Sequence, residues 1–463
     1  MPSCPTAGRR RHTIKEIFMG KFTVGTAKLD ITPGLGCHMS GYFDDRLATG
    51  IHDPLYVKAL AISDGEREIG LITLDNLYIS RPVVEKAKEL IQARTGVDAE
   101  HVLISVTHTH TGPGVIDLLG VPAEPGYAES LIPKITDAFV MAHNARVPAE
   151  IAHTSGDVHE EVHNRRWHMK DGSTVMNPGF MNPNAVCPAG PTDPQLGLLI
   201  ARDPETKKPL ALYANLALHY VGPMKVHTII SADYFEFFAY AMHRIAGTEF
   251  LVMMANGTQG NINNCDFTKP NRTSRTNFQQ AERVANVCAG EAWKAWNLLR
   301  DEDFKTEGFV DAKLSMVPFK ARTPSAELIE ESKKILAARE SHSKSEIIYA
   351  NEIMTMLTMP TEFDIPVQSL CVNDLGITGL PGEVFVEFGL DLKGRSPFPQ
   401  TMVVGLANDT VGYVATDKAL DEGSYETRLC CHVRSPKGTG QKWVDTAVAD
   451  LSELKSREGH APA

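Results

Sequence analysis

The stretch SVTHTHTGP, residues 105–113, places two histidines one residue apart directly after an apolar run. On a β-strand, residues i and i+2 point to the same face, so His108 and His110 would project together if the strand continued through them. The Gly-Pro that follows lets the chain turn away sharply. Two neighbouring imidazoles suit two metal ligands, or one ligand beside a general acid–base group. From this pattern alone, a structural pair hydrogen-bonded by the neighbouring threonines is the alternative.

Three further side chains occupy similar places in the sequence. His219 ends the apolar run LALYANLALHY, Glu383 follows a Pro-Gly turn at the predicted start of a helix, and Tyr413 follows an apolar run. Turns after strands are where α/β proteins gather functional side chains. Two imidazoles, a carboxylate and one further oxygen have the composition of a catalytic zinc site with room for a water. Taken singly, each residue also fits a structural role: a strand-end histidine, a helix-dipole contact or a packed aromatic ring.

The elements around these residues follow the order of an α/β protein. YVKALAISDGEREIGLITLDN predicts two strands joined by an Asp-Gly hairpin turn. The next segment predicts a helix that Ser80 caps, with Pro82 in its first turn and a glycine at its end. HVLISVT then predicts a buried strand that leads into the two histidines.

The rest of the chain repeats this alternation of hairpins and helices. The further elements predicted are a hairpin over 196–220, a strand and Gly/Asn loop over 250–264, helices at about 276–300 and 324–341, strand–turn–helix over 375–392, strand and loop over 401–416, and a closing helix at about 440–455. Hairpins and helix crossovers together imply mixed sheets flanked by helices. No repeat or long linker divides the chain, so we predict a loose extension over 1–20 and one α/β domain over 21–458.

Composition bounds the class of protein. The 463 residues are 43% hydrophobic and 22% charged, which is typical of a soluble globular enzyme. A net charge of −11 offers no basic field for a nucleic-acid partner. No run approaches the roughly 18–20 apolar residues of a membrane helix, and the N-terminus lacks the apolar core of a secretory signal. With eight scattered cysteines and no CxxC pair, we expect reduced thiols, a cytoplasmic location and a small-molecule substrate; the oligomeric state stays open.

Several motifs together resemble one known family, the neutral non-lysosomal ceramidases and their shorter bacterial relatives. They occur in family order from about residue 22 to about residue 450. The matching stretches are VGTAKLDITPGLGCHMSGY, GIHDPLYVKALAI, THTHTGP, HNRR, LALHY, ISADYFEFF, NGTQGNIN, LPGEVF, GYVAT and SYET. Each is weak alone, whereas the ordered set is specific.

The resemblance implies a zinc-dependent amidase fold with one zinc ion per chain. The ligands it implies are His108, His219, Glu383 and Tyr413. His110 and Arg165 would line the site, and zinc-bound water would attack the acyl carbon. His110 would carry the proton to the leaving group. Arg165, or Tyr413, would stabilise the developing oxyanion.

The sequence departs from the family in a loop and at its end. Ceramidases carry a Gly-Asp-x-Ser-Pro-type loop whose serine is needed for activity, and Asn263 stands at that serine position here. An asparagine can donate and accept hydrogen bonds but cannot act as a nucleophile. We expect Asn263 in the catalytic site, and Asn261, Asn264 and His52 on the substrate side. The chain also ends where the family's catalytic domain ends, which predicts a member without the C-terminal immunoglobulin-like domain.

These departures leave the zinc expectation intact and change the expected substrate. We expect a small polar molecule with an amide, ester or lactone bond. The alternatives are a true ceramidase and a non-catalytic member that binds zinc or a ligand. A metal-dependent amidohydrolase barrel is disfavoured, because its His-x-His stands near the chain start and needs a later metal aspartate. Asp233, in SADYFEFF, is expected to cap a helix.

Overall fold

The computed structural model describes residues 20–220, 227–271 and 276–458. The predicted N-terminal extension therefore lies outside the described residues except for its last position, Gly20. Gly20 opens a two-residue strand, β1 (Gly20–Lys21), which pairs antiparallel with β20 (Glu307–Gly308).

Three mixed sheets form the body of the protein. The first has the order β8-β7-β6-β2-β9, with strands Val102–Val106, Glu68–Leu74, Tyr56–Ser63, Thr23–Asp30 and Val147–Pro148. The second has the order β10-β15-β16-β18, with strands Glu150–Asp157, Gln195–Arg202, Pro209–Leu216 and Leu251–Asn256. The third has the order β21-β22-β23-β25, with strands Val310–Lys320, Glu362–Val372, Leu375–Gly379 and Gln400–Val404. Each sheet ends in one parallel pair, namely β7 with β8, β16 with β18 and β23 with β25, and its other pairs are antiparallel.

Short strands add local pairs around this body. They are β3 (His38–Met39) with β4 (Arg46–Leu47), β5 (Gly50–Ile51) with β17 (Ile229–Ile230), β11 (His163–Asn164) with β19 (Ile262–Asn263), and β24 (Glu383–Val384) with β26 (Tyr413–Val414). A small sheet has the order β13 (Thr174–Met176), β12 (Arg166–Met169) and β14 (Ala185–Pro188).

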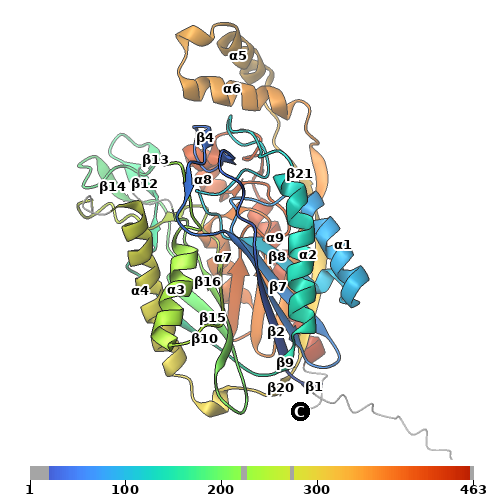
Figure 1. Cartoon of the computed structure of the whole chain (residues 1–463). Coiled ribbons are helices and arrows are strands. Elements are labelled where there is room, and N and C mark those ends of the chain that lie inside the picture. The colour runs from blue at the N-terminus through green and yellow to red at the C-terminus, as the bar shows by residue number, and fades with distance from the viewer. Residues whose placement is uncertain (1–19, 221–226, 272–275, 459–463) are drawn as a thin grey trace, which may run out of the picture.

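Helices cover the sheets in separate groups (Figure 1). Near the first sheet lie α1 (Arg81–Thr95) and α2 (Tyr127–Asn144), and α2 packs on β2 and β6. Beside the second sheet lie α3 (Tyr234–Ala246) and α4 (Asn277–Asn297). Against the third lie α7 (Val386–Arg395) and α9 (Thr439–Glu458), with the short α8 (Asp417–Glu422) in the loops. The helical pair α5 (Ala326–Ala337) and α6 (Lys344–Met356) stands above the body.

One apolar layer joins the three sheets. It contains Leu71 of the first sheet, Tyr213 of the second and Ile377 of the third, all at most 1% exposed. Burial of such side chains contributes about 1.5–3 kcal/mol each, so the sheets stabilise one another. No helix in the described part of the chain is both long enough and apolar enough to cross a membrane.

Most predicted elements are confirmed. The two hairpins, the buried strand before the histidines and the closing helix occur as expected, and α4 begins with a capping box at Thr276. The helix predicted at 324–341 is shorter: Ser325 caps it and α5 ends at Ala337. The next helix, α6, was not predicted. Ser80 precedes α1, but its side chain makes no capping hydrogen bond.

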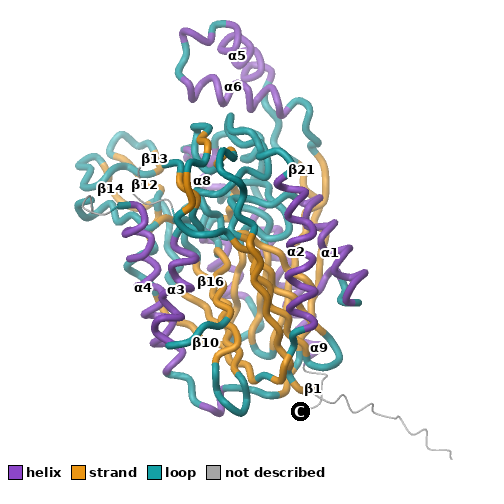
Figure 2. The backbone as a smooth tube through the Cα atoms, viewed as in Figure 1, coloured by secondary structure: helices purple, strands orange, loops and turns teal. Residues whose placement is uncertain are grey.

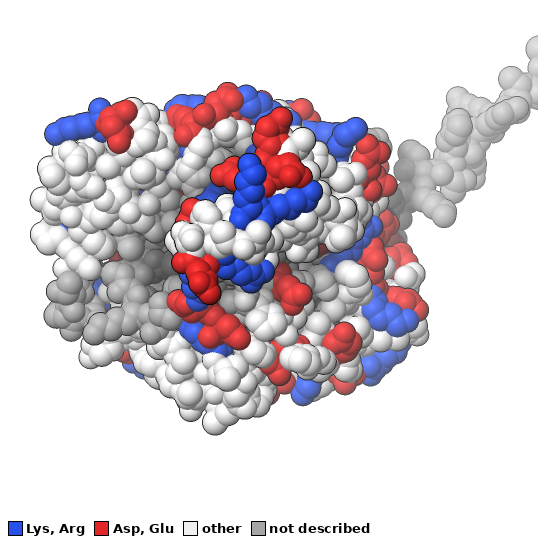
Figure 3. Space-filling model, turned by 90° about the horizontal axis from the view of Figure 1, so that it is seen from above, with Lys and Arg blue, Asp and Glu red and all other residues white. Residues whose placement is uncertain are grey.

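Loops gather between the strands and the α5–α6 pair (Figure 2). Hydrogen bonds join the loops that follow different strands: Asn256, at the end of β18, donates to the carbonyl of Thr107 after β8, and the N–H of Gly257 donates to Leu216 at the end of β16. Acidic and basic side chains are interspersed over α5–α6 on this side, and a broad part of the face carries neither (Figure 3). The histidines predicted as ligands lie in these loops.

Candidate metal centre

His108 lies just beyond a strand and not within one. Strand β8 ends at Val106, and His108 has a φ of 69°, so the strand does not continue through the two histidines. A positive φ is uncommon for a residue with a side chain and is found where the surrounding structure enforces it. Here the N–H of His108 donates to the Asn76 carbonyl at 2.9 Å, and Nδ1 donates to the Leu77 carbonyl at 2.8 Å. The neutral ring therefore keeps its lone pair on Nε2.

His110 is held in the same way from the opposite side. Its Nδ1 donates to the carbonyl of Gly41 at 2.8 Å. Gly41 has a φ of 106°, and a Cβ there would lie 2.8 Å from the His110 ring, so only glycine allows this approach. The carbonyl of His110 accepts a hydrogen bond from Arg46 at 2.8 Å. A carbonyl bond at Nδ1 is the usual way a ligating histidine is oriented.

A buried carboxylate supports the loop between these histidines. Asp233 accepts hydrogen bonds from the backbone N–H of His110 at 2.9 Å and from the hydroxyls of Thr109 and Thr111 at 2.9 and 3.1 Å. It precedes α3 but makes no capping bond, so the expected capping role is wrong. Asp53 supports the neighbouring segment, accepting from the Ser231 hydroxyl at 2.6 Å and the Ala232 N–H at 2.7 Å.

His219 contacts both another histidine and an arginine. Its Nε2 lies 2.8 Å from Nε2 of His110, and its Nδ1 accepts from Nη1 of Arg165 at 2.7 Å. Because a guanidinium only donates, the neutral His219 ring carries its proton on Nε2 and shares it with His110. Arg165 is anchored by Glu426, which accepts from its Nε at 2.9 Å, while Nη2 is buried without a partner.

Glu383 and Tyr413 lie side by side on paired strands. Glu383 was expected at the start of a helix, but α7 begins three residues later. Glu383 instead pairs with Tyr413 between β24 and β26. Its Oε1 accepts a hydrogen bond from the hydroxyl of Tyr78. Its Oε2 has no hydrogen-bond partner, although it lies 3.3 Å from Nε2 of His108 and 3.7 Å from Nδ1 of His219.

The electrostatics of the site favour a neutral His110, a neutral His219 and an ionised Glu383. Burial, followed by repulsion from His108, lowers the pKa of His110 to about 3. Burial and the charge of Arg165 lower the pKa of His219 well below its usual value. Burial would raise the pKa of Glu383, but its contacts with His108, Tyr78 and Arg165 outweigh burial and lower that pKa to about 2. These are the protonation states in which such groups bind metal ions.

The donor geometry fits a tetrahedral ion. Two ligand atoms of a zinc ion with bonds of about 2.0–2.1 Å lie about 3.3 Å apart. The spacings of 3.3 and 3.7 Å from Glu383 to the two imidazoles are close to this value. His108, His110 and His219 also form a cluster whose ligand atoms all lie within 4.8 Å of one another. Both possible ligand sets share His108 and His219.

A recess of about 520 Å³, part of it open to solvent, lies beside this centre. His108, His110, Glu383 and Tyr413 line it on one side. Its other walls are mostly apolar or aromatic and include Phe43, Leu77, Leu118, Leu119, Tyr349 and Val433. Helix α6 contributes Tyr349 to this wall. Among the described residues that line the recess, Glu383 is the one acidic side chain, and none is lysine or arginine.

The asparagine loop lies outside the lining of this recess. Asn261 is bound at both ends of its amide, to the Val386 N–H and the Glu387 carboxylate, each at 2.9 Å. Asn263 accepts from the Cys265 N–H at 2.9 Å and donates to Asn177 at 2.7 Å. These two amides are therefore engaged in holding the loop.

Asn264 and His52 also lie away from the histidine cluster. Asn264 lines a separate recess, and neither atom of its amide has a partner. His52 stacks on Phe278 with ring centroids 3.8 Å apart, and its Nδ1 lies 2.7 Å from the Asp53 carboxylate. The placement of both residues on the substrate side stays a prediction.

The structure adds residues to the site that the sequence reasoning did not single out. Tyr78 binds Glu383, Glu426 anchors Arg165, and His432 lines the recess. Tyr78 follows a strand like the other site residues, and Glu426 belongs to the SYET motif. The sequence therefore contained patterns from which both could have been predicted as site residues. His432 follows no strand and belongs to none of the family motifs, so no sequence pattern indicated it.

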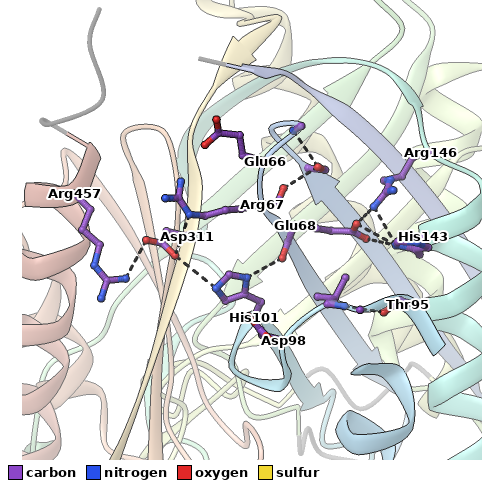
Figure 4. A pocket seen from close by; sticks show the side chains of 14 residues that line it. Glu66, Arg67, Glu68, Thr95, Asp98, His101, His143, Arg146, Asp311 and Arg457 are labelled. Atoms are coloured by element: carbon purple, nitrogen blue, oxygen red, sulfur yellow. Dashed lines mark hydrogen bonds and ion pairs between the residues drawn. The ribbon is translucent and has the colours of Figure 1, made fainter. Parts of the chain in front are cut away.

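A second, polar recess of about 1170 Å³ of empty space, much of it open to solvent, lies at the end of the molecule where β1 lies. Figure 4 shows that two of its carboxylates are paired: Asp311 with Arg457 at 3.0 Å, and Glu68 with His143 at 3.0 Å and with Arg146. His101 also lies 3.5 Å from Asp311. This pairing joins the first sheet to β21 and α9, which is a structural role.

Comparisons with known proteins agree with the fold. A family model described as neutral/alkaline non-lysosomal ceramidase, N-terminal, matches residues 22–297. The α/β chain described above thus belongs to the neutral/alkaline non-lysosomal ceramidase family.

Individual relatives are distant in sequence. Neutral ceramidase 3 of Arabidopsis thaliana is 28% identical over 155 residues, which are 31% of this chain and 21% of that protein. Neutral ceramidase A of Dictyostelium discoideum is 22% identical over 299 residues, 60% of this chain and 40% of that protein. The matches thus span less than half the length of either relative.

Two solved structures share the fold. A ceramidase complexed with C2 superposes with a TM-score of 0.73 at 17% identity, over 94% of this chain and 76% of that one. The neutral ceramidase of Pseudomonas aeruginosa gives a TM-score of 0.72 at 18% identity, over 94% and 75%. The expected mixed sheets flanked by helices are confirmed.

Proposed function

We propose that this protein is a zinc-dependent hydrolase that cleaves the amide bond of an uncharged, largely apolar acyl compound. The observation that carries the proposal is the Oε2 atom of Glu383. It is buried and ionised, has no hydrogen-bond partner, and lies 3.3 and 3.7 Å from two imidazole nitrogens. A buried charged oxygen without a partner is costly, and a cation between it and the imidazoles would remove that cost.

The ion would be held by His108, His219 and Glu383, with Tyr413 as the fourth ligand. Both ring nitrogens of His219 are hydrogen-bonded, so metal binding would replace one of these bonds. Nδ1 is the nitrogen that faces Glu383; if it ligates, Arg165 is released from it. When bound, zinc would lower the pKa of a water toward neutrality and polarise the substrate carbonyl.

The chain's own residues have separate roles in this proposal. His110 is neutral and fixed by Gly41, and its Nε2 accepts the N–H of His219 in this structure; once that bond is broken, Nε2 can take up a proton and pass it to the leaving nitrogen. Arg165 has one N–H group without a partner and would gain another on release from His219. A guanidinium held by Glu426 at this position would stabilise the oxyanion that develops in acyl transfer.

The recess supports a different substrate from the one expected from sequence. Its walls offer aromatic and aliphatic side chains and no lysine or arginine among the described residues. A lining of this kind suits an apolar group with few polar contacts. We therefore propose an N-acyl amide with an apolar acyl group in place of a small polar molecule. The same walls favour an N-acylsphingosine as the second candidate substrate.

Elemental analysis combined with a hydrolysis assay tests the proposal. Wild-type protein is expected to contain about one zinc per chain and to hydrolyse N-acyl amides with apolar acyl groups. His108→Ala and His219→Ala are each expected to lose the metal and the activity while remaining folded. His342→Ala is the matched control, because His342 is partly exposed and pairs with Glu346. Zinc-loaded protein that hydrolyses no amide, ester or lactone would favour the non-catalytic binding alternative.

A further inference from the structure

His432 is a fourth imidazole at the recess, and it is held on two sides. Its ring lines the same recess as His108 and Glu383. Its Nε2 lies 3.0 Å from the carbonyl of Asp117. Its own carbonyl accepts a hydrogen bond from the N–H of Tyr413 at 3.2 Å. Gly412 permits this approach, because a Cβ at that position would overlap the carbonyl oxygen of His432.

The contact with Asp117 fixes the tautomer of the ring. A carbonyl oxygen only accepts hydrogen bonds, so Nε2 of His432 must carry a proton. In the neutral ring, Nδ1 then holds the lone pair and can only accept. None of the described residues donates a hydrogen bond to this Nδ1.

Tyr78 is the aromatic neighbour of His432. One face of its ring lies parallel to Tyr78, with centroids 6.2 Å apart and planes inclined by 17°. The hydroxyl of Tyr78 already donates its hydrogen bond to Glu383. Leu118, Leu119 and Val433 line the same recess, together with Tyr349 and Tyr425. An acceptor in such surroundings gains free energy when a bound molecule supplies an N–H or O–H group.

Tyr78 lies near both His432 and the metal centre. The Tyr78 ring lies 5.3 Å from the ring of His108 and 6.2 Å from the ring of His432. A molecule whose carbonyl lies at His108 and Glu383 can therefore extend along the recess to His432. The polar group that it presents there would be separate from the bond that is cleaved.

We propose that His432 is a specificity-determining residue: its Nδ1 accepts a hydrogen bond from an O–H or N–H of the substrate, away from the scissile bond. The substrate class is then an acyl amide that is apolar in the main and carries one hydrogen-bond donor on its amine or acyl part. This inference rests on the proposed function for its kinetic consequence, but the binding contact itself does not require turnover.

Matched pairs of small amides test the contact. One pair is N-hexanoylethanolamine and its O-methyl ether; the other is the propylamide of α-hydroxyhexanoic acid and that of hexanoic acid. The wild-type protein is expected to prefer the hydroxyl member of at least one pair by about 10- to 100-fold in kcat/KM. In His432→Ala this ratio is expected to fall to about 1, with zinc content unchanged. His432→Gln, whose carbonyl can accept, is expected to restore part of the preference, and His342→Ala to keep all of it.

A second readout keeps the test independent of catalysis. In protein labelled at histidine nitrogens, the Nδ1 resonance of His432 is expected to shift on addition of the preferred hydroxyl compound but not of its partner without the hydroxyl. Hydrolysis without preference in either pair, or a preference that His432→Ala retains, would overturn the role of His432 and leave the proposed hydrolase standing. Absence of hydrolysis by zinc-loaded protein would contradict the hydrolase, and the nitrogen shift would still decide the contact.

Discussion

The carboxylate of Asp233 accepts a hydrogen bond from the backbone N–H of His110 at 2.9 Å. Two threonine hydroxyls of the same loop donate to this carboxylate as well. Asp233 and His110 are both at least nine-tenths buried. The loop that carries two of the three clustered histidines is thus held by a side chain 123 positions later in the sequence. Residues that orient metal ligands contribute to metal affinity without touching the ion.

Asp233→Ala is expected to weaken both the metal centre and the fold. The substitution leaves the buried N–H of His110 without its acceptor and removes one of the two acceptors of each threonine hydroxyl, so we expect a loss of about 1–3 kcal/mol in the free energy of unfolding. Zinc affinity should fall about 10- to 100-fold. Urea unfolding and competition with a chelator measure the two effects. Asp171→Ala, at an exposed turn, is the control; equal zinc affinity in the wild type and in Asp233→Ala would contradict the role of Asp233.

Glu383→Gln and Tyr78→Phe separate the ligand from the group that orients it. Glu383→Gln removes the buried charge, so zinc affinity should fall by more than about 100-fold. Tyr78→Phe keeps the charge and loses the hydrogen bond to Oε1, so the fall should be about 10- to 100-fold. Zinc titration of the metal-free variants gives both values. The reverse order of the two effects would argue against Glu383 as a ligand.

Glu426→Gln is expected to destabilise the fold strongly. Glu426 is fully buried and accepts hydrogen bonds from Arg165 and Arg166, each at 2.9 Å. Removing its charge leaves two buried guanidinium groups underpaired, which costs about 3–5 kcal/mol. Glu422→Gln is the control, because Glu422 is partly exposed and lies 3.5 Å from Arg166, so its loss should cost less than about 1 kcal/mol. Similar unfolding free energies for the two variants would contradict this assignment.

Asp311 is expected to make stability fall in acid. Burial would raise the pKa of this carboxyl, but hydrogen bonds from His101 and Arg457 outweigh burial and lower it to about 2. A lowered pKa stabilises the fold above the ordinary pKa of the carboxyl, and the effect is lost as pH falls toward about 2. The full contribution is about 2 kcal/mol, of which about 1 kcal/mol is lost by about pH 3.

The measurement for Asp311 is the free energy of unfolding at about pH 5 and about pH 3. Wild-type protein should lose about 1 kcal/mol more over this interval than Asp311→Asn does. An identical loss in both proteins would mean that the cluster shown in Figure 4 does not control acid stability.

Asn263→Ser restores the residue that the family carries but should not improve catalysis. In this structure Asn263 donates to Asn177 and accepts from the Cys265 N–H. Serine is too short to keep both bonds, so we expect a loss of about 1–3 kcal/mol in stability with zinc retained. Elemental analysis and thermal unfolding check this expectation. A gain in amide hydrolysis would instead indicate that this position reaches the substrate.

Local sequence determined most of the secondary structure and the places of the candidate ligands. The helix after Ser80, the strand before His108 and the long helix after Thr276 follow from apolar periodicity and turn chemistry, which depend only on neighbouring residues. The same reasoning placed His108 and His219 after strands. It also singled out Glu383 and Tyr413, and the family motifs added Arg165. His108, Glu383 and Tyr413 line one recess, His219 contacts His110 of the same lining, and the guanidinium of Arg165 lies 5.3 Å from the centroid of the Tyr413 ring.

Tertiary contacts decided how those residues meet. Glu383 belongs to a two-residue strand only because Tyr413 pairs with it. A strand of two residues is too short to show an alternating apolar pattern in the sequence. The Asp233 carboxylate makes no capping bond to α3 and instead accepts from the threonines of a loop more than 100 positions earlier in the sequence. His432 reaches the recess through contacts with Asp117 and Tyr413, neither of which is near it in the sequence. Propensity acts within a few residues, whereas these contacts arise from the packing of three sheets against one another.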